Sequence, residues 1–356
     1  MLGKSKLFKK SVENDFFQVL SQSLYTMIIR VFGAFSGFLL NVCVARTLAP
    51  DNAGELFTLL SLALFFGQLA TLGLGNWLLK VLSLEKANEN AIGLNSTFFQ
   101  TVYVVLILGT LFSLVIYLSS FQIALLLFDE SFEHQSIRIL SLAFPFVGLL
   151  AILMSAFQAV SKPVLGLAVH SVIQPLLFGL SCLLFVDDLQ EAIYSYLLSL
   201  FITLPIGFFF WKTIVFTKLV MPKPKWILSN EVDFYGFFFI MIIGIILTQG
   251  PILLSAALFS SKDVAFISIA IRIAGLTSFV LVACNMVLSP HFSRLKGSGD
   301  IKKIEEFALK GTYLMFALAS PLFIVLIVFP EFLLGFLVQT TLLPLPFTNI
   351  NCWTVC

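Results

Sequence analysis

Long runs of apolar residues, separated by short polar segments, recur along most of the chain. A helix of about 20 apolar residues crosses a bilayer, whereas barrel strands alternate over about ten residues. The uniformly apolar runs therefore predict an all-α polytopic membrane protein with about nine spans. The expected ranges are 22–45, 55–80, 96–119, 138–160, 163–186, 191–216, 234–259, 264–289 and 307–329.

A polar stretch with two prolines, KLVMPKPKWILSNEVDF, follows the sixth of these runs. Pro222 and Pro224 interrupt any helix there. The stretch predicts four parts, which are an N-terminal lobe of six spans, a cytoplasmic connector, a partial C-terminal lobe of about three helices and an aberrant tail. They cover residues 1–216, 217–233, 234–338 and 339–356, respectively.

The two lobes carry a faint repeat. LAPDNAGELFTLLSLAL follows the first span, and FSSKDVAFISIAIRIAG follows the seventh. Each has a polar turn, then a small residue (Gly54 or Ala265), then an apolar helix. Because six spans separate them, equivalent helices run in the same direction, with the repeat axis along the membrane normal. The repeat predicts two helical lobes around a central cavity.

Charge supports the same topology. Hydrophobic residues make up 59% of the chain and charged residues 11%, against about 25% charged in soluble domains. Most lysines and arginines fall in alternate segments, which the positive-inside rule assigns to the cytoplasm together with the N-terminus. The outer segments hold Arg46, Arg138 and Lys262. A net charge of +2 is too small to indicate nucleic-acid binding.

Two arginines, Arg30 and Arg272, lie deep inside apolar runs. A cation at the bilayer centre costs about 2.5–3.5 kcal/mol on insertion scales, so it usually faces a bundle interior or a wet cavity. There it can bind an anion. The alternative is that each side chain extends toward the interface or pairs with backbone carbonyls.

Helical spacing places further polar residues on common faces. The first span offers Arg30, Gly33, Gly37 and Asn41; the second Ser61, Gln68, Thr71 and Gly75; the seventh Gly244, Thr248, Pro251 and Ser255, with Gln249 adjacent; the eighth Ser268, Arg272 and Gly275. Gly33 and Gly37 also fit a helix-packing face. The candidate substrate-binding residues are Arg30, Arg272, Asn41, Gln68, Gln249 and Thr248, with Pro251 as a candidate hinge.

Other kinds of site find no support in the sequence. No acidic residue lies near the middle of any predicted span, which disfavours a coupling site built on a buried carboxylate. Phosphate-binding loops, catalytic triads and zinc-protease motifs are missing. We therefore expect a protein that is not an enzyme, with no catalytic residue, metal site or cofactor.

The segment RVFGAFSGFLLNVCVARTLAPDNAGELFTLLSLALFFGQLATLGLGNWLLK resembles the opening of the bacterial polysaccharide-repeat-unit flippases. These are the O-antigen and capsule exporters of the multidrug/oligosaccharidyl-lipid/polysaccharide superfamily. The shared features are an arginine in the first helix, an ARxLxPxxxG turn (Ala45, Arg46, Leu48, Pro50 and Gly54) and a second helix ending in glycines (Gly73 and Gly75). Residues 270–300 resemble the eighth helix and its loop, and the likeness covers about residues 16–338.

The resemblance implies two six-helix lobes that rock around a cationic cavity. It implies transport of undecaprenyl-pyrophosphate-linked oligosaccharide from the cytoplasmic to the outer leaflet of the bacterial inner membrane. Arg30 and Arg272 match positions where relatives carry cavity cations, and they would neutralise the pyrophosphate. The implied partners are this polyprenyl-linked oligosaccharide, membrane lipids, a polysaccharide polymerase and a chain-length regulator.

The chain departs from that family at its end. Members have twelve or more spans, whereas the apolar pattern here stops after FPEFLLGFLV at 329–338. The remaining QTTLLPLPFTNINCWTVC is too polar and proline-rich for a span. We expect a truncated or out-of-frame C-terminus, with about three helices missing from the second lobe.

Two other functions stay open. A multidrug exporter of the same superfamily would be expected to have a membrane-embedded carboxylate and a less cationic cavity. A membrane polymerase or ligase of the same pathway would be expected to have a large outer loop with catalytic residues, whereas the longest outer loop here is about 120–137.

Overall fold

The computed structural model describes residues 2–128, 132–214, 231–272 and 274–275, with shorter helical pieces between 309 and 324. Every regular element in this part of the chain is a helix. Most of the predicted connector and ninth span, and all of the predicted tail, lie outside the described residues. The four-part division of the chain stays a prediction.

The helices follow one another along the chain, with short connections as far as Ile214. They are α1 (Leu2–Thr47), α2 (Pro50–Leu69), α3 (Leu74–Ala87), α4 (Ala91–Leu118), α5 (Ser120–Leu127), α6 (Gln135–Ser141), α7 (Phe144–Ala159), α8 (Pro163–Leu167), the π-helical turn η1 (Ala168–Ile173), α9 (Gln174–Phe185), α10 (Leu189–Ile214) and α11 (Glu231–Leu258). Residues 261–272 form a further helix.

Seven helical stretches in the described part of the chain are long and apolar enough to cross a membrane. They are Tyr25–Thr47, Pro50–Leu69, Ala91–Leu118, Gln135–Ala159, Pro163–Phe185, Leu189–Ile214 and Tyr235–Leu258. Each overlaps one of the first seven predicted spans, and the helix at 261–272 overlaps the eighth. The predicted all-α polytopic class is confirmed.

The second predicted span, 55–80, is wrong toward its C-terminus. α2 ends at Leu69, and the chain turns through Leu72 and Gly73, whose φ angles are 46° and 77°. Glycine adopts this left-handed conformation without steric cost. A Cβ at Gly73 would also lie 2.7 Å from the carbonyl carbon and oxygen of Phe237 in α11. The apolar run therefore contains two helices, α2 and α3, with a bend where α11 packs.

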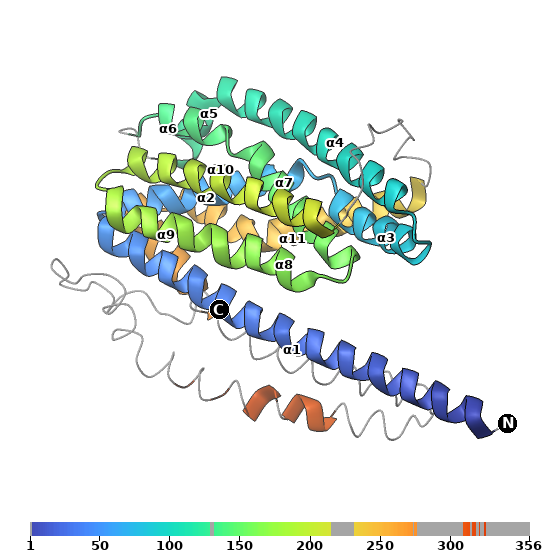
Figure 1. Ribbon diagram of the computed structural model, residues 1–356. Coiled ribbons are helices and arrows are strands. Elements are labelled where there is room, and N and C mark those ends of the chain that lie inside the picture. Colours follow the sequence, from blue (N-terminus) through green and yellow to red (C-terminus); the bar gives the residue numbers. More distant parts are fainter. Residues whose placement is uncertain are drawn as a thin grey trace.

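Figure 1 places α4 along one side of the bundle and α1 along the opposite side. Between them, α7 packs against α2, α3 and α4, while α10 joins α7 to α9. α9 and η1 in turn pack against α1. The apolar stretches of α2 and of the α6–α7 span are each 61% buried, against 22% for α1 and 17% for α11. α2 and α7 are thus the interior spans of the first lobe.

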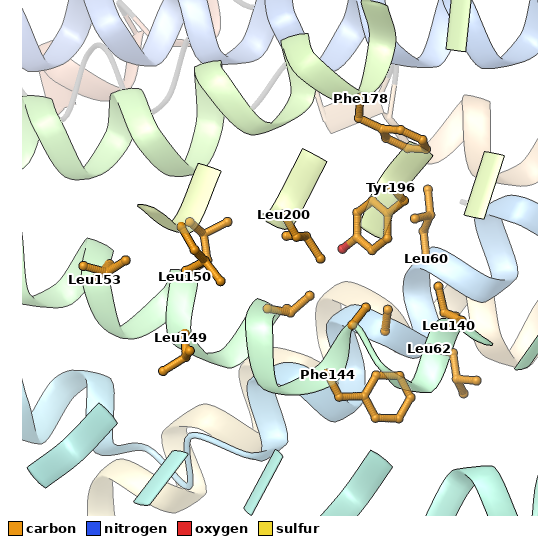
Figure 2. Close-up of a cluster of buried hydrophobic side chains, with 14 of the residues drawn as sticks. Leu60, Leu62, Leu140, Phe144, Leu149, Leu150, Leu153, Phe178, Tyr196 and Leu200 are labelled. Carbon is orange, nitrogen blue, oxygen red and sulfur yellow. The ribbon is translucent and has the colours of Figure 1, made fainter. Parts of the chain in front are cut away.

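Large apolar side chains fill the space between these interior helices. Figure 2 shows Leu62 of α2 on the side of Phe144 of α7, and Leu60 of α2 on the side of Tyr196 of α10, with Phe178 of α9 beyond Tyr196. The Phe178 and Tyr196 rings meet edge to face, with centroids 5.3 Å apart. Such pairs add to the packing energy that holds helices together in lipid.

An aromatic group near Trp211 extends this core. The Trp211 ring lies 4.2 Å from the Phe98 ring and 5.9 Å from the Phe157 ring. Its indole nitrogen donates a 3.3 Å hydrogen bond to Oδ1 of Asn95, so the polar atom of this buried side chain is satisfied. The group joins α4, α7 and α10.

The fifth span is irregular where it meets α1. Pro175 has no N–H to donate to the Ser171 carbonyl, and its ring crowds that carbonyl. The π-helical turn η1 ends just before this proline. The freed carbonyl faces α1, because a Cβ at Gly33 would lie 3.3 Å from the Ser171 oxygen and 3.0 Å from its Cβ. The small Gly33 residue permits this close contact.

Candidate functional site

α2 and residues 261–272, one from each half of the chain, meet in very close contact at Gly54. A Cβ on Gly54 would overlap the carbonyl oxygen of Ser261 and would lie 3.1 Å from the Ala265 nitrogen. Gly54 and Ala265 are the two small residues of the predicted repeat, so the structure brings these equivalent positions together. Ser61 lies two turns after Gly54 on the same side of α2, and Ser268 lies two turns after Ser261 on the same side of its helix. We call these two sides, with Ala265, the seam.

Arg272 reaches from the second half of the chain to the first. Its Nη1 donates a 2.5 Å hydrogen bond to Oδ1 of Asn41 in α1. Its guanidinium carbon lies 4.8 Å from the ring centre of Phe57 in α2, in the range of a cation–π contact. The Asn41 amide is itself fixed by a 2.6 Å hydrogen bond to the Gly37 carbonyl. Arg272 therefore links its own helix to α1 and α2.

The Arg272 guanidinium keeps unused hydrogen-bonding capacity. Guanidinium carries five N–H donors, and the Nε of Arg272 is buried without a partner among the described residues. Its plane and fork of donors suit a carboxylate or phosphate. Arg272 and Asn41 are thus two predicted site residues that the structure brings into contact.

Arg30 occupies a different level of α1. It precedes Asn41 by three helical turns, or about 16 Å along the axis. The side chain is half-buried, and its Nε is buried without a partner in the described part of the chain. The stripe that Arg30 shares with Gly33, Gly37 and Asn41 has a mixed character, since Gly33 packs on Ser171 while a Cβ at Gly37 would meet nothing within 4 Å.

Two hydroxyl groups are enclosed in the seam. Ser61 and Ser268 are 1% and 0% exposed, and neither hydroxyl has a partner among the residues that the structure describes. Each lies seven residues after a residue of the Gly54–Ser261 contact, and seven residues return a helix to the same face. The helices run in the same direction, because Gly54 contacts Ser261 whereas the later Phe57 contacts Arg272. Ser61 and Ser268 therefore lie at the same level.

The predicted stripe on the second span does not persist. Ser61 and Gln68 lie on α2, but Thr71 falls in the turn and Gly75 in α3. The left-handed residues at the bend end the helical register that the prediction assumed. Gln68 is half-buried near the end of α2.

The candidates on α11 lie apart from Arg272. Thr248 is exposed and donates to the Gly244 carbonyl of its own helix at 2.9 Å, and Gln249 is half-buried. No hydrogen bond in the described region joins either residue to Arg272 or Asn41. α11 continues through Pro251 as one helix. Cargo contacts at Gln68, Thr248 and Gln249, and a hinge at Pro251, stay predictions.

Acidic groups lie away from the middle of the bundle. Within the seven described spans the acidic residues are Asp51, Glu55 and Glu191, all in the first two turns of their helices. The described residues contain no group of three or more histidine, cysteine, aspartate or glutamate side chains that could hold a metal ion. The described site thus contains cations and hydroxyls rather than carboxylates.

Phe57 is a site residue that sequence reasoning missed. It shares a face with Ser61 four residues later, but one phenylalanine in an apolar run gives no signal of contact with a cation. Only the position of Arg272 in the folded chain reveals its role.

Comparisons with known proteins agree with this architecture. A model of the MatE family matches residues 237–343. A search of curated protein sequences gives no significant match. The chain is similar to the inward-facing conformation of a multidrug resistance MATE family transporter of the MOP superfamily, with a TM-score of 0.68 and 14% identity over 90% of this chain and 76% of that chain.

Two other solved structures are similar over nearly the same length. The outward-facing conformation of a multidrug resistance MATE family transporter gives a TM-score of 0.58 and 14% identity, over 89% of this chain and 73% of that chain. The MATE multidrug transporter DinF-BH, solved as a ligand complex, gives a TM-score of 0.60 and 16% identity, over 89% of this chain and 73% of that chain. The chain therefore has the fold of MATE transporters of the MOP superfamily.

Proposed function

We propose that this chain is a membrane transporter of the MATE type, which moves cargo through the space between its two lobes by alternating access. The observation that carries the proposal is the match of its fold to MATE transporters over 90% of the chain. The family-model match to residues 237–343 adds support from the second half of the sequence. The expected setting is the bacterial inner membrane, with the N-terminus in the cytoplasm.

The comparisons support export of drugs or toxins at least as well as transport of a lipid-linked oligosaccharide. The similar solved proteins are described as multidrug transporters, one of them in complex with a ligand. Since these likenesses rest on fold, they do not specify the cargo of this chain. The third alternative, a polymerase or ligase, gains no support from comparisons with transporters.

One feature of the site favours an anionic cargo as the second candidate. Arg272 holds a buried, unpartnered Nε among the described residues, and no carboxylate lies mid-span there to neutralise it. Arginine binds phosphate oxygens through two parallel N–H bonds. Undecaprenyl-pyrophosphate-linked oligosaccharide, with Arg30 and Arg272 as its cationic contacts, would fit this chemistry. A polysaccharide polymerase and a chain-length regulator would then be its partners.

A binding experiment separates the two cargoes. The purified protein in lipid nanodiscs would be titrated with ethidium, an apolar organic cation, and, separately, with a polyprenyl pyrophosphate. For the multidrug exporter we expect saturable ethidium binding that Arg272→Gln leaves intact. For the flippase we expect polyprenyl pyrophosphate binding that weakens at least about tenfold in Arg272→Gln, because a charge-assisted bond to a buried anion is lost.

A neighbouring cation provides the matched control. Arg46 lies in the last turn of α1, at the end predicted to be outer, and Arg46→Gln should leave both titrations unchanged. Equal losses in Arg46→Gln and Arg272→Gln would mean that general charge, not a site at Arg272, governs binding. Failure of the protein to bind either ligand or to move either across proteoliposomes would contradict the transporter proposal.

A further inference from the structure

The seam differs from an ordinary helix interface because it encloses polar groups that have no partner. Nearly all buried polar atoms in folded proteins make a hydrogen bond. The Ser61 and Ser268 hydroxyls and the Nε of Arg272 make none within the described part of the chain. Each such group opposes burial. A contact that stayed closed permanently would be more stable with alanine in place of the serines.

Two buried serines elsewhere in the bundle, Ser141 and Ser199, do have hydrogen-bond partners. Ser141 is fully buried, donates to the Arg138 carbonyl at 2.8 Å and lies 3.4 Å from the Ser113 hydroxyl. Ser199 donates to the Tyr196 carbonyl at 2.7 Å and accepts from Gln174. A buried serine in this bundle can therefore find a partner, whereas the two fully enclosed hydroxyl oxygens of the seam have none among the described residues.

The expected orientation puts the seam toward the outer surface. With a cytoplasmic N-terminus, α1 ends and α2 begins on the outer side of the membrane. Gly54 and Ser261 lie in the first turns of their helices and thus near that surface, and Arg272 lies deeper. The Gly54 contact closes the outer end of the space between the halves of the chain.

The overall shape agrees with closure on that side. The similarity to an inward-facing MATE transporter has a TM-score of 0.68, whereas the similarity to an outward-facing one has a TM-score of 0.58. The two matches involve equal sequence identity, so sequence relatedness does not account for the difference.

We propose that the seam is the outer gate of this transporter, closed in this structure, and that its opening exposes Ser61, Ser268 and Arg272 to polar cargo. The inference rests on the proposed function. Gly54 permits closure because no side chain fits between α2 and the Ser261 carbonyl. The unpartnered hydroxyls keep closure reversible, since they gain hydrogen bonds to water or cargo when the helices separate.

Arg272 and Asn41 form the latch of this gate. In the closed state the arginine donates to Asn41 and stacks on Phe57, so it ties residues 261–272 to α1 and α2. An anionic or carbonyl-bearing cargo would compete with Asn41 for the same guanidinium. Cargo binding would thereby weaken the bond that holds the gate closed.

A cysteine reporter tests the gate without measuring transport. Cys43, Cys182, Cys284, Cys352 and Cys356 would be replaced by alanine, and Ser268→Cys introduced. In right-side-out vesicles, an impermeant maleimide should react slowly with this cysteine, because Ser268 is 0% exposed in the closed seam. Adding Gly54→Leu should wedge the gate open and raise the rate at least about tenfold, as for a shift toward an accessible state.

A second glycine gives the matched control. Gly236→Leu introduces the same side chain on α11, where a Cβ would meet nothing within 4 Å, and should leave the labelling rate unchanged. Asn41→Ala removes the latch without adding bulk and should raise the rate by a smaller factor than Gly54→Leu. Monodisperse elution of each variant would exclude unfolding as the cause of labelling.

Three results would overturn the gate. These are equal labelling in the Gly54→Leu and Gly236→Leu variants, fast labelling in the parent with no further rise, and labelling from the cytoplasmic side alone. The outcomes also separate this inference from the proposed function. If labelling follows the predicted pattern but neither cargo binds, the gate is supported and the transporter proposal is contradicted. If a cargo binds but Gly54→Leu leaves labelling unchanged, the transporter proposal is supported and the gate is contradicted.

Discussion

The interior of the first lobe and the seam between the halves are both fully enclosed, yet their chemistry is opposite. Around Trp211 the lobe interior uses large aromatic rings 4.2 and 5.9 Å apart, and the indole N–H is paired with Asn95. The seam uses glycine, alanine and serine, and its two hydroxyls lack partners among the described residues. The first region is built to stay closed and the second to separate.

This difference has an energetic basis. In lipid, helices associate through van der Waals packing and interhelical hydrogen bonds, because burial from water adds little. Interlocking aromatic side chains must all move before the lobe can come apart. The small side chains across the seam do not interdigitate, so the helices there can separate without repacking large side chains. The predictions below test this contrast.

The largest expected effect is in the aromatic core. Trp211→Ala should lower the free energy of unfolding by about 3 kcal/mol, because it leaves a cavity beside Phe98 and removes the hydrogen bond to Asn95. Thermal unfolding in detergent would measure it. Phe209→Ala, at a position 63% exposed on the same helix, is the control and should have little effect. Equal losses in the two variants would remove the distinction between core and lipid-facing residues.

A second test compares two glycines of α2. A Cβ at Gly67 would lie 2.6 Å from the Val147 side chain, so Gly67→Leu should overpack the lobe interior and cost about 1–3 kcal/mol. It should not raise maleimide labelling at Ser268→Cys, in contrast to Gly54→Leu. If Gly67→Leu opened the seam as effectively as Gly54→Leu, the two regions would not be independent.

Buried serines should respond in opposite directions. Ser61→Ala removes an unpartnered hydroxyl and should stabilise the closed protein by about 1 kcal/mol. Ser141→Ala removes a hydroxyl that bonds to the Arg138 carbonyl at 2.8 Å and should destabilise by a similar amount. Thermal shifts of opposite sign would support the contrast; a destabilised Ser61→Ala variant would mean that its hydroxyl has a partner after all.

The smallest expected effect is at the predicted cytoplasmic face. Burial lowers the pKa of Lys86 below its usual 10.5, and the charge of Lys162 lowers it further. A lysine whose pKa is lower in the folded state than in the unfolded state destabilises the folded protein when it is charged. This loss of stability is full below the folded-state pKa and disappears as the pH rises to the unfolded-state pKa. Lys162→Gln should therefore stabilise by less than about 0.5 kcal/mol at pH 7, since both side chains are exposed. The gain should vanish above pH 10.5; a gain that grew with pH would contradict this cause.

Much of this architecture could be predicted from apolar run length alone. Each of the first seven predicted spans overlaps a helix long and apolar enough to cross a membrane, since helices are the only common open-ended way to satisfy the backbone in lipid. Run length alone missed the bend at Leu72 and Gly73, although Gly73 and Gly75 marked the end of the second helix in the family resemblance. The bend lies against Phe237, which is far away in the sequence, so the packing there could not be read from the run itself.

The candidate site was only partly predictable. Arg272 and Asn41 were recognisable as polar groups in apolar runs, but their mutual hydrogen bond depends on how α1 and residues 261–272 pack. The faint repeat pointed to Gly54 and Ala265 without indicating that they touch. The repeat places the segments that carry Gly54 and Ala265 around a common axis. Only the folded structure shows that both segments lie close enough to that axis to touch.

The most direct test of the account is a distance measurement across the outer ends of the seam helices. Spin labels at Asp51→Cys and Lys262→Cys, both exposed, would be followed by pulsed electron paramagnetic resonance in nanodiscs. We predict a short distance in the parent protein and a second, longer component that becomes dominant in Gly54→Leu. A single distance that Gly54→Leu leaves unchanged would contradict an outer gate at the seam.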